Sequence, residues 1–157
     1  MMQKTALFPG SFDPITKGHI DALEKVIPIF DKVYVALGIN TSKQYYFTIE
    51  ERLSMLKATF ESYPKVEVIS YQGLTVKFCE KMAIPYIIRG LRNTIDFEYE
   101  KAINEMNHKL NPDVHTFFVT TSPDYASISS TIVREIIKSG GKVDDFVPQS
   151  VVDNLKK

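Results

Sequence analysis

Residues 8–19 of this chain, Phe-Pro-Gly-Ser-Phe-Asp-Pro-Ile-Thr-Lys-Gly-His, combine residue types that suit the binding of an anion. They follow an apolar run and precede apolar residues at helical spacing, so we expect a strand, this loop and then a helix. Gly10 lets the main chain approach a ligand closely, and a helix start offers unpaired N–H groups to phosphate. His19 would lie in the first helical turn, beside the same anion. A tight turn with a surface histidine would use the same residues.

The loop matches neither of the two common phosphate-binding patterns. No second glycine is followed by Lys-Ser or Lys-Thr at P-loop spacing, and Gly-x-Gly-x-x-Gly does not occur. What remains is Thr-x-Gly-His at residues 16–19, which is a weak signal by itself. The other parts of the chain must therefore support a phosphate site.

Two arginines follow a second apolar run, Tyr86–Ile88, which we expect to be a strand. Guanidinium groups make forked, permanently charged contacts to phosphate, so Arg89 and Arg92 are interpreted as an anion clamp. Asp96 comes at the start of the next helix, where acidic residues are expected on dipole grounds alone. Glu100 lies one turn later and could face the same cleft.

Residues 125–131, Tyr-Ala-Ser-Ile-Ser-Ser-Thr, place several hydroxyls around another helix start. Such clusters are usually caps and turns, but one cap needs only one hydroxyl, so we interpret this segment as a second anion site. Lys43 stands in a polar loop after an apolar run, where it could meet a substrate phosphate. A solvated surface lysine would look the same.

Composition limits the class of protein. The chain has 157 residues, and we expect residues 1–157 to form one domain. Nineteen basic and nineteen acidic side chains cancel, so no bulk field favours nucleic acid or an acidic membrane. The lone Cys79 excludes an internal disulfide, and we expect it in the core. The three histidines are scattered, and no signal peptide or membrane-length apolar run occurs, so a cytoplasmic location is expected.

The periodicity predicts alternating strands and helices. The expected strands are Thr5–Phe8, Val33–Ile39, Val66–Tyr71, Tyr86–Ile88 and His115–Thr120. The expected helices are His19–Phe30, Ile49–Ser62, Thr75–Met82, Asp96–Leu110, Ser130–Lys138 and Pro148–Lys156. Alternation of this kind indicates an α/β fold with a parallel sheet and helices on both faces, and with ligands at the carboxyl ends of the strands. Pro28 should end or kink the first helix near Ile27. Residues 48–51, Thr-Ile-Glu-Glu, predict a capping box.

The motifs together resemble those of bacterial phosphopantetheine adenylyltransferases. They are Gly-Ser-Phe-Asp-Pro with Thr-x-Gly-His, Arg-Gly-Leu-Arg with Asp-Phe-Glu-Tyr-Glu, and Ile-Ser-Ser-Thr-x-x-Arg, in that order along essentially the whole chain. Nicotinate mononucleotide adenylyltransferases and cytidylyltransferases share the first and last motifs, but usually have histidine where this chain has Thr16. The Arg89–Glu100 segment is more specific for phosphopantetheine adenylyltransferases than the first and last motifs are. Ser11 departs from the threonine common in the family, keeping the hydroxyl and losing a methyl.

The resemblance implies a three-layer, Rossmann-like fold of the nucleotidyltransferase type. It implies transfer of the adenylyl group of ATP to 4′-phosphopantetheine, giving dephospho-coenzyme A and pyrophosphate in coenzyme A biosynthesis. Mg²⁺ would be carried by the ATP phosphates, because no carboxylate cage or other metal ligand set is visible. A homohexamer and feedback by coenzyme A are further implications, whereas no nucleic-acid or membrane partner is expected.

The resemblance also assigns roles to residues. His19 and Lys43 are the expected catalytic residues. ATP is expected to be bound by Ser11, Phe12, His19, Gly90, Leu91, Arg92, Glu100, Tyr125, Ala126, Ser127, Ile128, Ser129, Ser130 and Thr131. The pantetheine substrate is expected to be bound by Ser11, Lys43, Thr75 and Arg89. The charge of His19 is left open, because the helix start disfavours the imidazolium and the triphosphate favours it.

Three alternatives remain at this point. A related transferase could use another phosphate, such as nicotinate mononucleotide, although Thr16 and the Arg89–Glu100 segment argue against it. A non-catalytic adenine-nucleotide sensor would keep the binding loops without turnover. Nucleic-acid binding comes last, because the chain has zero net charge and no stripe of basic residues.

Overall fold

The computed structural model describes residues 3–156. The strands are β1 (Thr5–Gly10), β2 (Lys32–Ile39), β3 (Val66–Gln72), β4 (Tyr86–Leu91) and β5 (His115–Thr120). The helices are α1 (Lys17–Val26), α2 (Ile49–Phe60), α3 (Thr75–Met82), α4 (Thr94–Leu110), α5 (Ser130–Lys138) and α6 (Gln149–Leu155). Two 3₁₀ turns, η1 (Ile27–Ile29) and η2 (Pro123–Tyr125), complete the order. None of the helices described is long and apolar enough to cross a membrane.

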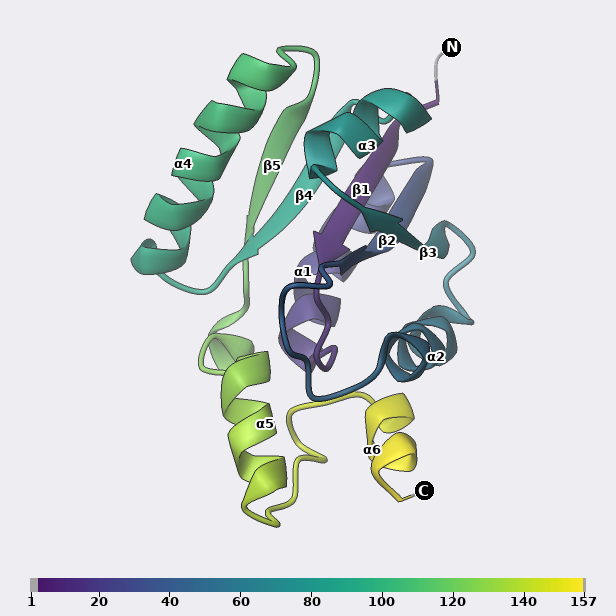
Figure 1. Cartoon of the computed structure of the whole chain (residues 1–157), viewed down its shortest axis with the longest axis vertical. Helices are drawn as coiled ribbons and strands as arrows, with labels where there is room; N and C mark the ends of the chain where they lie inside the picture. The colour runs from purple at the N-terminus through teal and green to yellow at the C-terminus, as the bar shows by residue number, and fades with distance from the viewer. Residues whose placement is uncertain (1–2, 157) are drawn as a thin grey trace.

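The five strands form one parallel sheet in the order β3-β2-β1-β4-β5. The chain proceeds outward from β1 to β3, then returns to the other side of β1 to form β4 and β5. The order therefore reverses between β1 and β4, which is where open parallel sheets bind ligands. The predicted α/β class is confirmed, and Figure 1 shows α5 and α6 beyond the carboxyl ends of the strands.

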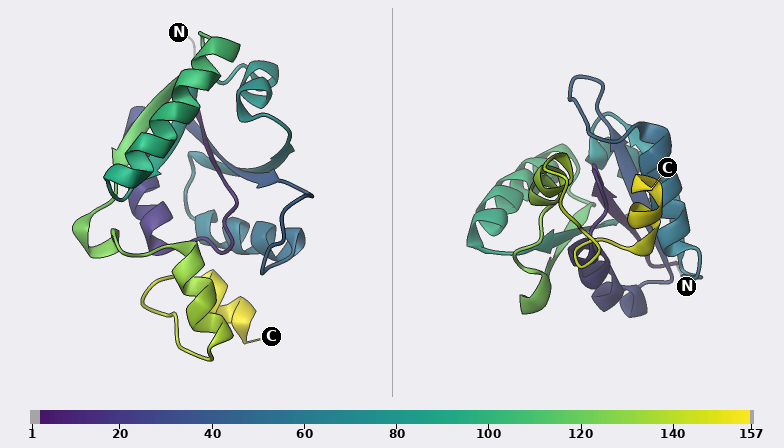
Figure 2. Two further views of the ribbon diagram at one scale, coloured as in Figure 1. Left: turned by 60° about the vertical axis from the view of Figure 1, so that its left-hand side comes forward. Right: turned by 90° about the horizontal axis from the view of Figure 1, so that it is seen from below.

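Helices cover both faces of the sheet, giving three layers (Figures 1 and 2). Successive side chains of a strand point to opposite faces, so a continuous apolar run such as Ala6–Phe8 makes both faces apolar. Ala6 and Phe8 pack into the core cluster formed with α1 and α2, whereas Leu7 packs into a second cluster formed with α3. Cys79 is fully buried in this second cluster, as predicted.

Several predicted boundaries were wrong, and one matters for the site. Strand β4 continues through Leu91, because Arg89–Leu91 pair with Phe118–Thr120 of β5. Arg89 and Gly90 are therefore strand residues, held by the ladder, and not part of a loop after it. Helix α1 ends at Val26 and continues as the short turn η1, which contains Pro28, as that proline predicts. Pro148 caps α6 rather than beginning it.

Candidate active site

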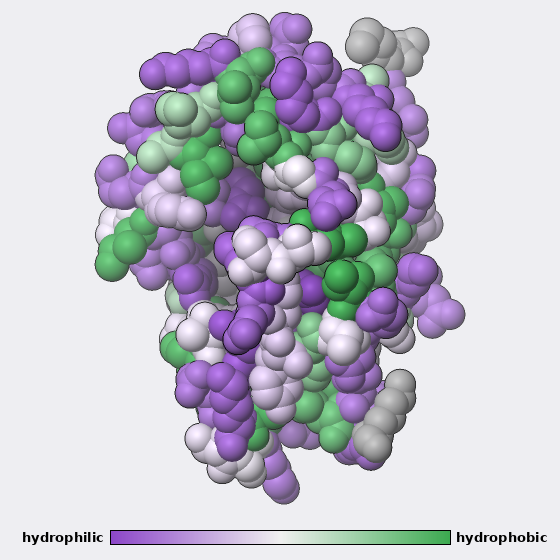
Figure 3. All heavy atoms as spheres, viewed as in Figure 1, coloured by the Kyte–Doolittle hydropathy of each residue, from purple (hydrophilic) through white to green (hydrophobic). Residues whose placement is uncertain are grey.

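A cleft of about 410 Å³ opens at the carboxyl ends of the strands. The loop after β1, the end of β4, the start of α1 and the start of α5 surround it. Figure 3 shows hydrophilic side chains in the hollow that opens beside α4. Eleven predicted site residues line the cleft: Ser11, Phe12, His19, Arg89, Gly90, Arg92, Glu100, Ile128, Ser129, Ser130 and Thr131. Two helix starts facing one cleft favour an anionic ligand.

The loop after β1 turns sharply at Phe12, whose φ of 45° lies in the left-handed region. Residues other than glycine adopt this conformation rarely. The turn folds the Phe12 ring back over Gly10, where an added Cβ would come within 3.0 Å of it. The same ring meets the imidazole of His19 edge-on, with 5.2 Å between ring centroids. A side chain at position 10 would therefore crowd the Phe12 ring, and Gly10 leaves room for it.

His19 takes part in a capping box at the start of α1. The backbone N–H of Thr16 donates to Nδ1 of His19 over 3.0 Å, and the Thr16 hydroxyl accepts from the His19 backbone N–H over 3.4 Å. Because a backbone N–H can only donate, Nδ1 must accept, and the neutral imidazole then carries its proton on Nε2. His19 lines the cleft, and Nε2 is the ring nitrogen that the capping box does not use.

The charge of His19 follows from its surroundings. Burial, together with the nearby charges of Arg89 and Arg92, lowers the pKa of His19 from 6.5 to about 4. Protonating Nδ1 would also set two donors, that nitrogen and the Thr16 N–H, against each other. In the unliganded protein near pH 7, His19 is therefore a neutral donor.

Both predicted clamp arginines are held by carboxylates of α4. Arg89 donates from Nε and Nη2 to the two oxygens of Glu100, over 2.8 and 2.6 Å, and from Nη1 to the Pro9 carbonyl over 2.8 Å. Arg92 makes the corresponding forked contact with Asp96, over 2.9 and 3.1 Å. Asp96 and Glu100 are one helical turn apart and both line the cleft. The carboxylates fix both guanidiniums, each of which has five N–H donors, in place.

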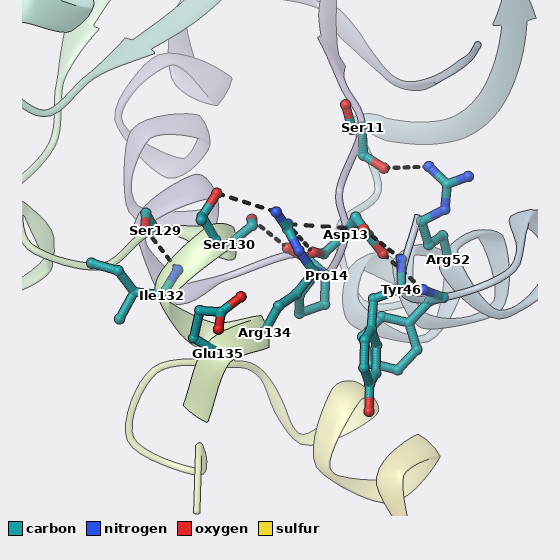
Figure 4. Close-up of polar contacts among 12 residues, drawn as sticks. Ser11, Asp13, Pro14, Tyr46, Arg52, Ser129, Ser130, Ile132, Arg134 and Glu135 are labelled. Atoms are coloured by element: carbon teal, nitrogen blue, oxygen red, sulfur yellow. Dashed lines mark hydrogen bonds and ion pairs between the residues drawn. The ribbon is translucent and has the colours of Figure 1, made fainter. Parts of the chain in front are cut away.

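A third arginine, Arg134 of α5, also lines the cleft. It donates to the Asp13 backbone carbonyl over 2.7 Å and lies 3.8 Å from the Asp13 carboxylate. The Ser130 hydroxyl donates to the Pro14 carbonyl over 2.8 Å, and Ser129 caps α5. Figure 4 shows these contacts converging on the loop after β1. Arg134 belongs to the last sequence motif, but the motif alone gave it no role.

A smaller recess of about 130 Å³ adjoins the cleft and shares Pro9, Arg89 and Glu100 with it. Thr75 of α3 lines this recess together with Arg89, so the structure brings these two predicted pantetheine-side residues together. The Tyr71 hydroxyl lies 2.8 Å from that of Thr75. Arg89 stands at the junction of the two cavities.

Five predicted residues do not line either cavity. Lys43 is exposed in the loop between β2 and α2, and Leu91 is buried at the end of β4. Tyr125, Ala126 and Ser127 lie in and after η2, before α5. Their assigned roles stay predictions. Within residues 3–156, no group of three His, Cys, Asp or Glu side chains is placed to hold a metal ion.

Comparisons with known proteins agree with this architecture. The cytidylyltransferase-like family model matches residues 7–136. A solved Vibrio parahaemolyticus structure, provisionally described as a nicotinate-nucleotide adenylyltransferase, has a TM-score of 0.78 at 19% identity and covers 99% of this chain and 100% of its own. At that identity it shows the fold alone. The chain thus has the nucleotidyltransferase fold and belongs to the cytidylyltransferase-like class.

Closer relatives narrow the class. The phosphopantetheine adenylyltransferase of Flavobacterium psychrophilum is 46% identical over 148 residues, covering 94% of this chain and 97% of that protein. That of Staphylococcus carnosus is 43% identical over 157 residues, covering 100% and 98%. The chain belongs to the phosphopantetheine adenylyltransferase family. The resemblance inferred from the motifs is confirmed.

Proposed function

We propose that this chain transfers the adenylyl group of ATP to 4′-phosphopantetheine, giving dephospho-coenzyme A and pyrophosphate. The observation that carries the proposal is the position of Arg89, where the large cleft meets the small recess. ATP bound in the cleft and 4′-phosphopantetheine, with its pantetheine arm in the recess, would each place a phosphate near this guanidinium. Full-length relatives with this activity support the same substrates.

The cleft offers separate donors to the two phosphate groups. The starts of α1 and α5, with Arg92, are assigned to the ATP triphosphate, and the His19 Nε2–H is aimed at the reacting α-phosphate. Arg89 is assigned to the pantetheine phosphate, with Thr75 alongside the arm. Lys43 extends from an exposed loop, and we assign it to the same phosphate.

The reaction needs positioned charge rather than a protein nucleophile. An oxygen of the pantetheine phosphate, already anionic, attacks the α-phosphorus of ATP in line, and the bond from that phosphorus to the β-phosphate oxygen breaks. Pyrophosphate leaves with the electron pair, so no proton is taken from the acceptor. Fixed donors such as His19 Nε2–H then stabilise the charge that builds on the reacting phosphoryl group. The described residues form no carboxylate cage, so Mg²⁺ is treated as part of the Mg-ATP substrate.

Pyrophosphate release from Mg-ATP tests the reaction and its acceptor. We compare 4′-phosphopantetheine, nicotinate mononucleotide and no acceptor, and we identify the product by mass. Release only with the pantetheine substrate, together with dephospho-coenzyme A, is the expected result. Release only with the mononucleotide would replace the acceptor, and ATP binding without release would favour a nucleotide sensor.

Substitution of Arg89 tests the assignment of the two phosphates. Arg89→Ala removes a charged donor worth roughly 1.5–3 kcal/mol, so the KM for 4′-phosphopantetheine should rise about tenfold to a hundredfold. The double variant Arg89→Ala with Glu100→Gln is the control, because it leaves no buried carboxylate without its partner. Weakened ATP binding with an unchanged pantetheine KM would exchange the roles of Arg89 and Arg92.

We further propose a homohexamer and feedback by coenzyme A. Helix α4 exposes Ile95, Tyr99 and Met106 with 59% or more of each residue accessible, which suits an interface between copies of this chain. Coenzyme A differs from the expected product, dephospho-coenzyme A, by one additional phosphate group. We therefore expect it to bind in the same cleft. Light scattering should give six times the chain mass, and coenzyme A should compete with 4′-phosphopantetheine. A monomer, or no inhibition, would contradict the respective proposal.

A further inference from the structure

Arg52 is the most deeply buried charged residue in the described part of the chain, with 1% of its surface accessible. It is the fourth residue of α2, and its guanidinium reaches the loop after β1. Burying a guanidinium is costly unless its N–H groups find acceptors. A methionine or leucine would fill such a position without that cost. The charge at this position therefore needs a reason beyond packing.

The contacts of Arg52 connect the loop after β1 with the loop before α2. Its Nη1 donates to the backbone carbonyl of Ser11 over 2.8 Å, as Figure 4 shows. Its Nε lies 3.4 Å from the Thr48 carbonyl, and its Cζ lies 3.9 Å from the centre of the Tyr45 ring. Ser11 belongs to the loop after β1, and Tyr45 to the loop that carries Lys43. The guanidinium is thus held from both sides.

The carbonyl that Arg52 binds belongs to the Ser11–Phe12 peptide. In a planar trans peptide the C=O and N–H bonds point in opposite directions. Ser11 and Phe12 line the cleft, whereas Arg52 is buried behind them. Holding the Ser11 carbonyl toward Arg52 therefore turns the Phe12 N–H away from α2, toward the cleft.

The Phe12 conformation makes such a restraint necessary. Its φ of 45° is a strained value for a phenylalanine, and strained backbone persists only where surrounding contacts determine it. The Phe12 ring supplies one restraint by packing over Gly10 and against His19. The hydrogen bond from Arg52 fixes the other end of the same turn.

We propose that Arg52 is a positioning residue, which holds the Ser11–Phe12 peptide so that the Phe12 N–H faces the phosphates of ATP. It touches neither substrate itself. The proposal rests on ATP as the ligand of the cleft. Without Arg52 the peptide can rotate, and the cleft loses a fixed donor while its arginines and His19 remain.

Binding of Mg-ATP in the absence of acceptor is the first measurement, using Arg52→Met and Arg52→Lys. Methionine keeps most of the volume and removes every donor, so the Kd for ATP should rise about tenfold or more, the usual effect of losing one N–H contact to a charged group. Lysine keeps one donor for the Ser11 carbonyl, so its Kd should lie between those of the wild type and Arg52→Met. Both variants should also lower kcat.

Leu56→Ala is the matched control. Leu56 is a fully buried residue of the same helix, and its truncation leaves a cavity that should lower the unfolding midpoint. Assayed at a temperature where all variants are folded, it should leave the ATP Kd and kcat near wild-type values. Wild-type ATP affinity and kcat in Arg52→Met, with only a lowered unfolding midpoint, would overturn the proposal and leave Arg52 a structural brace.

The Phe12 amide resonance decides the matter if Arg52→Met does not fold. In Arg52→Lys that resonance should shift, and its response to added ATP should shrink relative to the wild type. An unchanged Phe12 amide with an unchanged response would overturn the proposal. The product assay on the wild type separates the two proposals, because failure to form dephospho-coenzyme A refutes the reaction but leaves an effect of Arg52 on ATP binding intact.

Discussion

The described part of the chain has two reciprocal capping boxes, and they differ in the side chain that returns the hydrogen bond to the cap. At the start of α2, the Thr48 hydroxyl accepts from the Glu51 N–H over 3.1 Å, and Glu51 accepts from the Thr48 N–H over 2.8 Å. At the start of α1, Thr16 plays the part of Thr48, but His19 replaces the glutamate. Thr48 is exposed, whereas Thr16 is 2% accessible.

The replacement gives the α1 box a second use. A glutamate at this position would use its carboxylate for the cap and would add a negative charge to the cleft. An imidazole has two nitrogens, so Nδ1 closes the cap while Nε2–H stays available to a ligand. The hydrogen bond that stabilises the helix start also selects the tautomer that can donate to phosphate.

Removing His19 should have the largest effect. His19→Ala deletes the donor that we assign to the reacting phosphate, so kcat should fall about a hundredfold to a thousandfold, with ATP affinity less affected. Steady-state kinetics check this, with His108→Ala, an exposed histidine of α4, as the control. A raised KM with unchanged kcat would make His19 a ground-state contact only.

His19→Glu separates the two uses of the box. It rebuilds the α2 type of cap, so the unfolding midpoint should be higher than in His19→Ala. The added carboxylate would repel phosphate, so kcat should stay at or below that of His19→Ala. Recovery of activity together with the midpoint would show that capping, and not the donor, is what His19 contributes.

Acid should destabilise the unliganded protein partly through His19. Its folded pKa of about 4 lies below the 6.5 of an unperturbed histidine, so between these values the unfolded state binds the extra proton. Above about pH 6.5 His19 is neutral in both states and does not reduce the free energy of unfolding. As the pH falls from 6.5 toward 4, protonation of the unfolded state lowers that free energy progressively. From pH 7 to 5 the wild type should lose up to about 2 kcal/mol more unfolding free energy than His19→Ala. Urea titrations at both pH values measure this, and equal losses would contradict a buried neutral imidazole.

The α2 box should give the smallest effect. Thr48→Ala removes one exposed cap, so the free energy of unfolding should fall by about 1 kcal/mol. Because Thr48 and Glu51 line neither the cleft nor the recess, kcat and both KM values should stay within the error of the wild type. A drop in kcat comparable to that of His19→Ala would erase the distinction between the two boxes.

Local patterns were sufficient for most of the fold. Apolar periodicity located every strand and helix described, and the spacing of Thr48 and Glu51 correctly predicted the capping box of α2. The end of β4 was misplaced because Arg89 and Gly90 are not strand-like residues, and only their pairing with β5 keeps them extended. The family and its reaction followed from motif order, and the relatives bear them out.

The inner contacts of the site could not be predicted, because they join residues far apart in the chain. Nothing near Arg52 in the sequence marks its bond to Ser11, 41 residues away. The left-handed turn at Phe12 is equally hidden, since glycine is the residue expected there. The sequence marks His19 as a candidate phosphate ligand, but it does not reveal the bond from Thr16 that orients the imidazole.

The three arginines of the cleft each lie beside one acidic side chain, so the cleft holds three positive and three negative groups: Arg89 with Glu100, Arg92 with Asp96, and Arg134 with Asp13. Such a site projects little long-range field and does not collect polyanions from a distance. Selection takes place at contact range, where only a molecule that reaches several fixed N–H groups at once gains enough to stay.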